Sequence, residues 1–137
     1  MKKLSLLIGC FCFMLLKAEQ PKEVFNNEQL SITYSNSDCH DNPNGIHQEK
    51  VLLTFQNKTQ QTITVSFDRN LWYDNVALNT SGNEKRFTVV LAPNQQITGE
   101  CATKDKAFSI FSKHLDFKGR SLTKFALENV SISKTDK

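Results

Sequence analysis

Residues 51–67 read VLLTFQNKTQQTITVSF, and this stretch decides the fold class. Apolar side chains fill every second position over 51–55 and again over 63–67, and a polar segment at 57–60 separates the two runs. A period of two is typical of β-strands that bury one face. The stretch therefore predicts two antiparallel strands that form a hairpin with its turn at 57–60.

Similar short runs recur about every ten residues, with polar turns between them and no sustained helical spacing after Ala18. The alternation slips between Ile110 and Phe111 and again between Leu127 and Val130, which predicts β-bulges. The pattern predicts an all-β fold, an antiparallel two-layer immunoglobulin-like sandwich of seven to eight strands. Besides the hairpin, the predicted strands lie at 30–34, 71–73, 87–91, 97–101, 108–111 and 125–132.

Residues 1–18 are typical of a secretory signal peptide. The segment has two lysines near its start, continues with an apolar run of 13 residues over 4–16, and ends at Ala18, a small residue suited to cleavage. The run is too short to span a membrane. We therefore expect one domain over 19–137, secreted or periplasmic, with no membrane span after cleavage. Lipid anchoring through Cys10, which ends a lipoprotein-like sequence, is the alternative.

Charge and cysteine content further restrict the kind of protein and the partners that we expect. The chain has 17 basic and 14 acidic residues, but three of the lysines lie in the predicted signal peptide, so the remaining domain carries no net charge. A neutral domain without a basic stripe predicts no nucleic-acid partner. Cleavage also removes Cys10 and Cys12, and we expect Cys39 and Cys101 to form a disulfide after export. Two buried free thiols are the alternative.

Three stretches of the sequence carry a resemblance to other proteins. They read QEKVLLTF at 48–55, LAPNQQ at 91–96 and LTKFAL at 122–127. Together they resemble a group of small exported proteins from Bacteroidetes-type bacteria. The resemblance implies an immunoglobulin-like β-sandwich and export from the cell. It implies no activity, because these proteins have no assigned activity to carry over.

The candidate ligand-binding residues are Trp72, Tyr73, Asp74 and Asn75. An exposed aromatic pair beside two polar side chains is suited to stacking on a sugar ring while the polar groups bind its hydroxyls. Trp and Tyr also anchor many protein–protein interfaces. The alternative is that Trp72 closes one end of the core and Tyr73 covers it.

The segment 37–45 is rich in oxygen ligands of the kind that Ca²⁺ prefers. An EF-hand is excluded, because with Gly45 at the sixth position the twelfth is Val51 and not a bidentate glutamate. The alternative is an ordinary tight loop, which uses the same residue types. His40 and His47 form no zinc motif, so we expect no metal and no cofactor. The candidate calcium ligands are Asp38, Asp41, Asn42 and Asn44.

These observations favour a binding domain over an enzyme. We expect an exported, non-enzymatic domain that recognises an envelope protein or a glycan at a strand edge or a loop end. The alternative is a small hydrolase or metal-assisted enzyme that uses polar residues of the 37–47 segment, such as His40 and Asp41. No serine lies in a nucleophile elbow, but catalytic sites are recognised by geometry rather than by sequence order.

Overall fold

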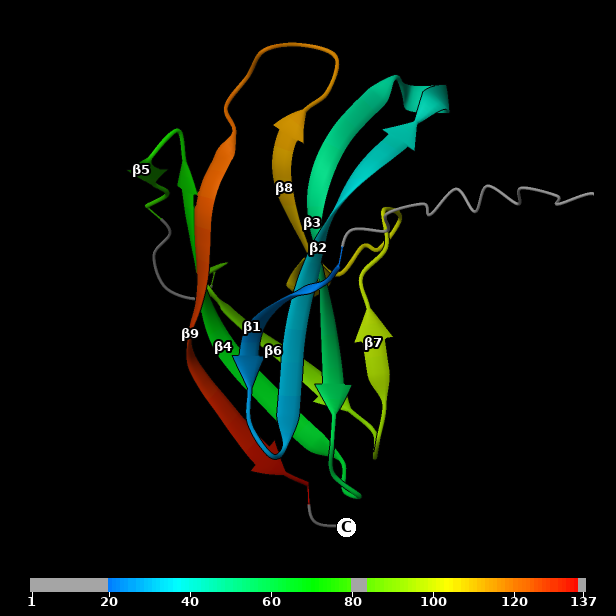
Figure 1. The fold of residues 1–137 in the computed structure, drawn as a ribbon, viewed down its shortest axis with the longest axis vertical. Coiled ribbons are helices and arrows are strands. Elements are labelled where there is room, and N and C mark those ends of the chain that lie inside the picture. The colour runs from blue at the N-terminus through cyan, green and yellow to red at the C-terminus, as the bar shows by residue number, and fades with distance from the viewer. Residues whose placement is uncertain (1–19, 80–83, 136–137) are drawn as a thin grey trace, which may run out of the picture.

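The computed structural model describes residues 20–79 and 84–135, which form nine β-strands in two antiparallel sheets (Figure 1). The predicted signal peptide at 1–18 lies outside the described residues. Sheet A contains β1 (Lys22–Asn26), β2 (Leu30–Asp41), β3 (Ile46–Asn57), β7 (Gln96–Thr98) and β8 (Ser109–His114). Sheet B contains β4 (Ile63–Tyr73), β5 (Val76–Ala77), β6 (Arg86–Leu91) and β9 (Leu122–Lys134). Two short 3-10 turns, η1 (Asn42–Asn44) and η3 (Lys106–Phe108), connect strands.

Each sheet is built around one long central strand. In sheet A, β1, β2 and β3 lie side by side in chain order, and the other edge of β3 pairs with β8 over 48–52 and with β7 over 54–56. In sheet B, β9 pairs with one edge of β4 from Ile63 to Tyr73, while β6 and β5 share the other edge. The central strands β3 and β4 thus organise the two layers.

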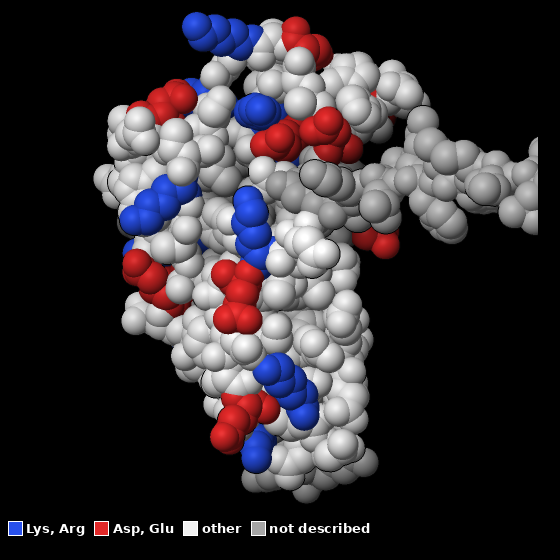
Figure 2. Space-filling model, viewed as in Figure 1, with Lys and Arg blue, Asp and Glu red and all other residues white. Residues whose placement is uncertain are grey.

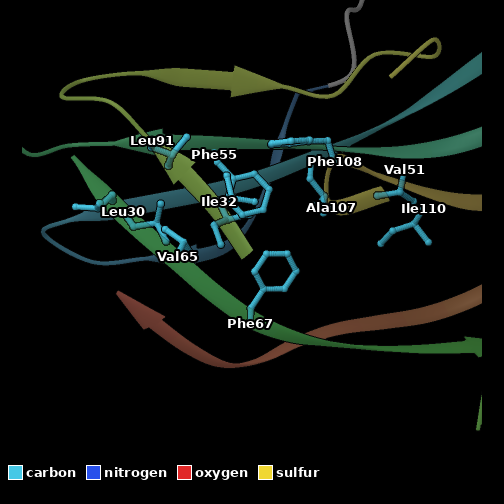
Figure 3. Close-up of a cluster of buried hydrophobic side chains, with 13 residues drawn as sticks. Leu30, Ile32, Val51, Phe55, Val65, Phe67, Leu91, Ala107, Phe108 and Ile110 are labelled. Atoms are coloured by element: carbon cyan, nitrogen blue, oxygen red, sulfur yellow. The ribbon is translucent and has the colours of Figure 1, made fainter. Parts of the chain in front are cut away.

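The two sheets pack face to face around aromatic side chains (Figure 3). The Phe55 ring of β3 lies 5.6 Å, between ring centroids, from Phe67 of β4 and 5.5 Å from Phe108. Burial of such large apolar side chains is the main force that holds two layers together. The predicted all-β, antiparallel, two-layer fold is confirmed. The core consists of Leu30, Ile32, Val51, Leu53, Phe55, Ile63, Val65, Phe67, Val89, Leu91, Ala107, Phe108 and Ile110.

The immunoglobulin-like strand order is not confirmed, and the described residues form nine strands instead of the predicted seven to eight. In an immunoglobulin constant domain the third strand lies in the sheet opposite the first two. Here β1, β2 and β3 are neighbours in sheet A. The predicted strand at 71–73 is the end of β4, and the two unpredicted strands are β1 and β5. β1 shows no alternation because its register shifts between Glu23 and Phe25.

The predicted hairpin over 51–67 is wrong in its pairing. Both runs form strands, but β3 belongs to sheet A and β4 to sheet B, so they face each other across the core. Alternation identifies the buried face of a strand but not its hydrogen-bonded neighbour. The segment 58–62 therefore crosses between the layers instead of forming a hairpin turn.

Asn57 fixes this crossing from inside the protein. Its side chain is 1% exposed, and its amide nitrogen donates hydrogen bonds to the backbone oxygens of Gln61 (2.8 Å), Leu91 (3.3 Å) and Ala92 (2.9 Å). Its Oδ1 accepts from the backbone nitrogen of Thr59 at 2.9 Å. A buried amide with all of these partners ties the end of β3 to the end of β6.

Both predicted irregularities of the alternation correspond to register shifts. In β9, two residues lie opposite Phe67 alone, and one of them, Asn129, has a left-handed φ of 50°. In β8, the shift falls opposite Glu49 and Lys50, at Ser112, directly after the predicted position. An extra residue reverses the inward and outward alternation, which is the pattern that the sequence showed in β9. In β8, Ile110 and Phe111 themselves remain in continuous register with Val51 and Lys50, so the predicted slip is one residue too early.

Gly99 occupies a place where the backbone itself is in close contact. A Cβ atom at this position would lie 2.2 Å from the carbonyl oxygen of Phe108. The backbone nitrogen of Gly99 donates to the oxygen of Leu53 at 2.9 Å, so the residue is held against β3 as well. Only glycine fits between these two segments.

Candidate binding site

Beyond the core, the β2–β3 hairpin continues as a polar extension. We call residues 36–41 of β2 and 46–50 of β3, with η1 between them, the tip ribbon. Figure 1 shows it curving away from sheet B. The paired register continues to Asp41 opposite Ile46, and Gly45, with φ 62°, completes the turn. The predicted loop over 37–45 is therefore partly strand, since residues 37–41 belong to β2.

The disulfide ties a distant segment to the tip ribbon. Cys39 and Cys101 are bonded, with their Cα atoms 5.4 Å apart, which confirms the predicted pairing. The Lys50 Nζ donates to the backbone oxygen of Cys101 at 3.1 Å. Beside this contact lies a groove of about 410 Å³, which we call the disulfide groove. It is lined by Cys39, His40, Asp41, Asn42, Pro43, Ile46, Lys50, Cys101 and Ala102.

One edge of the tip ribbon is unpaired. The pairing of β1 with β2 ends at Lys22 opposite Tyr34, and in the described part of the chain no strand pairs with this side of β2 from Ser35 to Asp41. We call this stretch the free edge. A strand of this length with unpaired backbone groups is able to accept a further strand.

Hydrogen bonds on the far side of β3 show which backbone groups point off the free edge. The oxygens of Leu53 and His47 accept from Gly99 and Leu115, so these two residues direct their backbone groups away from β2. Tyr34 and His40 are the partners of these two residues in the antiparallel ladder. The N–H and C=O groups of both partners therefore point away from β3. By the same alternation, Asn36, Asp38 and His40 present their N–H and C=O groups at the free edge. The N–H and C=O groups of Ser37 and Cys39 form hydrogen bonds with β3.

A second groove, of about 340 Å³, lies beside Lys22, the first residue of β1. We call it the side groove, and it lies between sheet A and the start of β9. Tyr34 and Phe125 meet edge to face in it, with ring centroids 4.9 Å apart. The groove therefore combines an aromatic wall with polar groups at the base of the free edge. Its lining consists of Lys22, Tyr34, Asn36, Val51, Ser112, Leu122, Thr123, Lys124 and Phe125.

A carboxylate network supports the inner face of the ribbon next to this groove. The buried Ser112 hydroxyl donates to Glu49 Oε1 at 2.7 Å, and Lys113 Nζ lies 3.8 Å from Glu49 Oε2. The Asn36 amide approaches Glu49 Oε1 at 3.5 Å. Glu49 thus connects β2, β3 and β8 and keeps the groove wall in place.

The predicted ligand-binding aromatic pair is not formed. Trp72 and Tyr73 are consecutive residues of β4 and so face opposite sides of sheet B. The Tyr73 hydroxyl donates to the backbone oxygen of Phe111 at 2.7 Å, between the sheets, while Trp72 packs under Lys124 Nζ, 4.6 Å from the ring centroid. Trp72 is half-buried, so it keeps some contact with solvent.

Asp74 and Asn75 form the turn between β4 and β5. Both have left-handed φ values, 49° and 65°, which the short hairpin connection requires. Asp74 Oδ1 accepts from the backbone nitrogen of Ser121 at 3.2 Å, and the Asn75 backbone nitrogen donates to Thr123 Oγ1 at 3.0 Å. These contacts tie the turn to the start of β9.

The candidate calcium ligands are spread over both faces of the hairpin. Asp38 and Asp41 are three residues apart in β2 and therefore point to opposite faces. Asp41 Oδ2 accepts from the Asn44 amide at 2.7 Å, which stabilises the η1 turn. Over residues 20–79 and 84–135, no group of three or more His, Cys, Asp or Glu side chains could hold a metal ion. His40 and Asp41 likewise face opposite sides, so they are not arranged as a catalytic pair.

Sequence reasoning missed the contact between His40 and His47. The two residues are direct partners in the β2–β3 register, and their Nδ1 atoms lie 2.9 Å apart. The available signal was symmetry: both histidines are equally far from the turn that Asn42, Pro43, Asn44 and Gly45 form. The third histidine, His114, stacks on Phe117 with ring centroids 4.0 Å apart.

Two groups of β4 with shifted pKa values lie between the sheets. Burial lowers the pKa of Arg69 to about 10, so the guanidinium remains charged at neutral pH. It donates to the backbone oxygens of Lys106 (2.6 Å) and Ser109 (3.4 Å), and it lies 4.2 Å from the centroid of the Phe87 ring. Burial also raises the pKa of Tyr73. Both side chains fasten the η3–β8 segment to sheet B.

Comparison with known families, curated proteins and solved structures gives no match for this chain. The family resemblance noted above therefore remains a prediction. Within the described ranges, no helix is long and apolar enough to cross a membrane. On the face shown in Figure 2, basic and acidic side chains are interspersed.

Proposed function

We propose that this chain is an exported, non-enzymatic binding domain that holds an extended segment of a partner protein along the free edge of β2. The free edge carries the proposal, because Asn36, Asp38 and His40 direct outward backbone groups that pair with no strand of the described residues. Cys101 Sγ lies 3.9 Å from the Asp38 oxygen and leaves the Asp38 N–H available. Strand addition uses such groups for affinity and neighbouring pockets for side-chain specificity. The disulfide supports this use, since it holds the ribbon in place without covering the edge with another strand.

The side groove defines the side chain that the partner would supply. A strand added next to β2 continues the line of β1, and its first inward side chain lies beside Tyr34 and Phe125, the aromatic wall. We therefore expect an apolar or aromatic residue at that point. Polar residues should follow, because the inner face of the ribbon beyond it carries Asp38, Glu49 and the two histidines.

A glycan remains the competing ligand, with Trp72 as its platform. That ring lies under Lys124 on the outer face of sheet B, away from Tyr73. A single half-buried ring gives a sugar less contact than the predicted aromatic pair. We therefore favour the protein ligand and treat the glycan as an outcome of the test.

The experiment captures the partner with the exported full-length gene product and then locates the binding surface. The immobilised protein is exposed to envelope extract of the producing organism, retained proteins are identified, and overlapping synthetic peptides of each are titrated against the soluble protein. Hydrogen exchange then compares residues 35–41 with and without peptide. We expect these amides to become protected.

The substitution D38P tests the edge, and D38N is its matched control. Asp38 directs its N–H off the free edge, so proline removes one edge donor while leaving the β2–β3 hydrogen bonds intact. We expect D38P to lose peptide binding at least tenfold, and D38N, which keeps the N–H, to bind like the natural protein. Equal binding by all three, protection near Trp72 only, or retention of a glycan instead would refute the proposal. A dimer in solution that D38P dissociates would show that the edge serves a second copy of the chain.

A further inference from the structure

His40 and His47 form a close pair at the far end of the tip ribbon. They are opposite each other in the β2–β3 register and their side chains lie on the same, inner face. Because His40 directs its backbone groups off the free edge, the two residues form a non-hydrogen-bonded pair, the type in which side chains approach most closely. Their Nδ1 atoms are 2.9 Å apart, and their ring centroids 5.1 Å.

We propose that His40 and His47 together bind one divalent transition-metal ion, with Cu²⁺ as the ion bound most tightly. Neutral imidazole nitrogen is a ligand for Zn²⁺, Ni²⁺ and Cu²⁺, and affinity at a given nitrogen site rises to its maximum at Cu²⁺. This site is separate from the strand-binding function proposed above and does not depend on it. The metal is bound by the imidazole nitrogens alone, and no added strand is needed for that.

The spacing of the two nitrogens suits a shared metal. Two imidazole nitrogens at about 2.0–2.1 Å from one ion, with an angle between a right angle and a tetrahedral one, lie roughly 2.9–3.4 Å apart. The observed 2.9 Å is within that range. In the metal-free pair one Nδ1 donates a hydrogen bond to the other. On binding, both rings tilt toward a common point, for which the exposed position of His40 leaves room.

The proton balance follows from the tautomers. The donating ring carries its proton on Nδ1, and this proton moves through solvent to the Nε2 of the same ring. Each imidazole then remains neutral and has a lone pair on Nδ1 for the metal. No oxidant or reductant is needed, because the step exchanges a hydrogen bond for two coordination bonds.

The residues around His40 and His47 favour binding of a cation, and the two histidines fill only part of its coordination shell. The next cross-strand pair on the same face consists of Asp38 and Glu49. Lys113 lies 3.8 Å from the Glu49 carboxylate and offsets its charge, so Asp38 is the carboxylate that adds negative charge. In the described part of the chain, no third His, Cys, Asp or Glu joins the pair in a metal-holding group. Water molecules therefore complete the coordination, and these positions are open to exchange with an external ligand.

The test titrates CuCl₂ into the full exported protein by calorimetry, in a buffer that does not bind copper. The variants are H40Q, H47Q and the double variant. H114Q is the matched control, because it removes a histidine that stacks on Phe117 and is paired with Gln48 in the β3–β8 register, not with His40 or His47. We expect one tight Cu²⁺ per chain in the natural protein and in H114Q. Each single variant should bind this ion about tenfold more weakly or worse. The double variant measures copper bound elsewhere, for example at the amino terminus.

Electron paramagnetic resonance of the Cu²⁺ complex provides an independent readout. The natural protein should show coupling to two imidazole nitrogens, and each single variant to fewer. Thermal melts without copper establish that the variants are folded. Copper binding in H40Q and H47Q that equals the natural protein, or a loss in H114Q as large as in these variants, would overturn the proposal. So would the absence of any tight site in the natural protein.

Discussion

The two halves of the β2–β3 hairpin use the same pairing but are held by different forces. In the half that contains Leu30 and Phe55, one face of the ribbon is covered by sheet B and the side chains are fully buried. In the tip ribbon, both faces are largely polar. Its strands are held by their own ladder, by the pairing of β3 with β8 at 48–50, by the Glu49 network and by the Cys39–Cys101 disulfide. Burial of apolar area thus stabilises one half, whereas backbone pairing, the Glu49 network and a covalent bond stabilise the other.

This difference shows how a small domain can present a polar, partly unpaired surface without losing its fold. An isolated two-stranded hairpin is marginally stable in water. The tip ribbon is not isolated, because its base is anchored in the core and the disulfide joins it to the segment after β7. Four experiments test the comparison, in order of decreasing expected effect.

The first removes aromatic volume from the core half. F55A leaves a cavity beside Phe67 and Phe108, and we expect a loss of about 3–5 kcal/mol in the free energy of unfolding, measured with urea. The control V90A truncates a side chain that is 58% exposed on the same fold, and its effect should stay within about 0.5 kcal/mol. Similar losses in both variants would mean that the core does not carry the stability of this half.

The second removes the covalent bond from the tip ribbon. The double variant C39A/C101A should lose roughly 2–4 kcal/mol, because the unfolded chain gains the freedom of a loop whose ends are 62 residues apart. Hydrogen exchange should accelerate most at 37–41 and 46–50, with smaller changes at 63–67. Acceleration that is uniform over the whole chain would contradict the division into two differently stabilised halves.

The third compares two glycines, one on each side of the division. G99A places a Cβ atom 2.2 Å from a backbone oxygen of Phe108, so the backbone has to move, and we expect a loss of about 1–3 kcal/mol. In G45A the added Cβ atom has no other atom within 4 Å. The only loss comes from placing alanine at a left-handed φ, and we expect it to lower the stability by about 1 kcal/mol. Thermal melts rank the two variants. A larger effect for G45A would mean that the turn, and not the close approach, is the stricter constraint.

The fourth concerns a carboxylate on the outer face of sheet B. The hydrogen bond from Asn129 and then the one from Arg86 lower the pKa of Asp68 below its ordinary value of 3.8. A lowered folded-state pKa gives stability that is present above pH 3.8 and lost as the pH falls through the folded-state value. The stability difference between the natural protein and D68N should therefore shrink as the pH drops from about 5 to 2. D116N, which changes an exposed carboxylate, is the control.

Features that depend on local geometry were the ones predictable from the sequence. Alternation identified the buried faces of β3 and β4. The phase slip after Leu127 marked a real register shift, and the slip predicted before Phe111 was one residue from the shift in β8. The single pair of cysteines left after residue 18 predicted the disulfide. In each case the residues that cause the feature are adjacent in sequence or few in number.

Features that depend on long-range pairing were not predictable. The segment after Asn57 crosses to the opposite sheet, and a polar connection looks the same whether it turns or crosses. Residues 37–41 were predicted as part of a loop over 37–45, because neither face of this stretch is apolar, although β3 pairs with all five of them. For the same reason the contact between His40 and His47 was missed, since it exists only when the hairpin register is known.

The buried amide of Asn57 has a practical consequence for producing the protein. Asn57-Lys58-Thr59 matches the acceptor pattern for N-linked glycosylation, yet its nitrogen already donates hydrogen bonds to backbone oxygens inside the fold. If a eukaryotic secretory host attached a sugar to Asn57 during translocation, the side chain could not be buried, and the connection between β3 and β4 could not take its folded position. Replacing Thr59 to remove the pattern would sacrifice its own hydrogen bond to Asn57. Expression should therefore use a host that leaves asparagine unmodified.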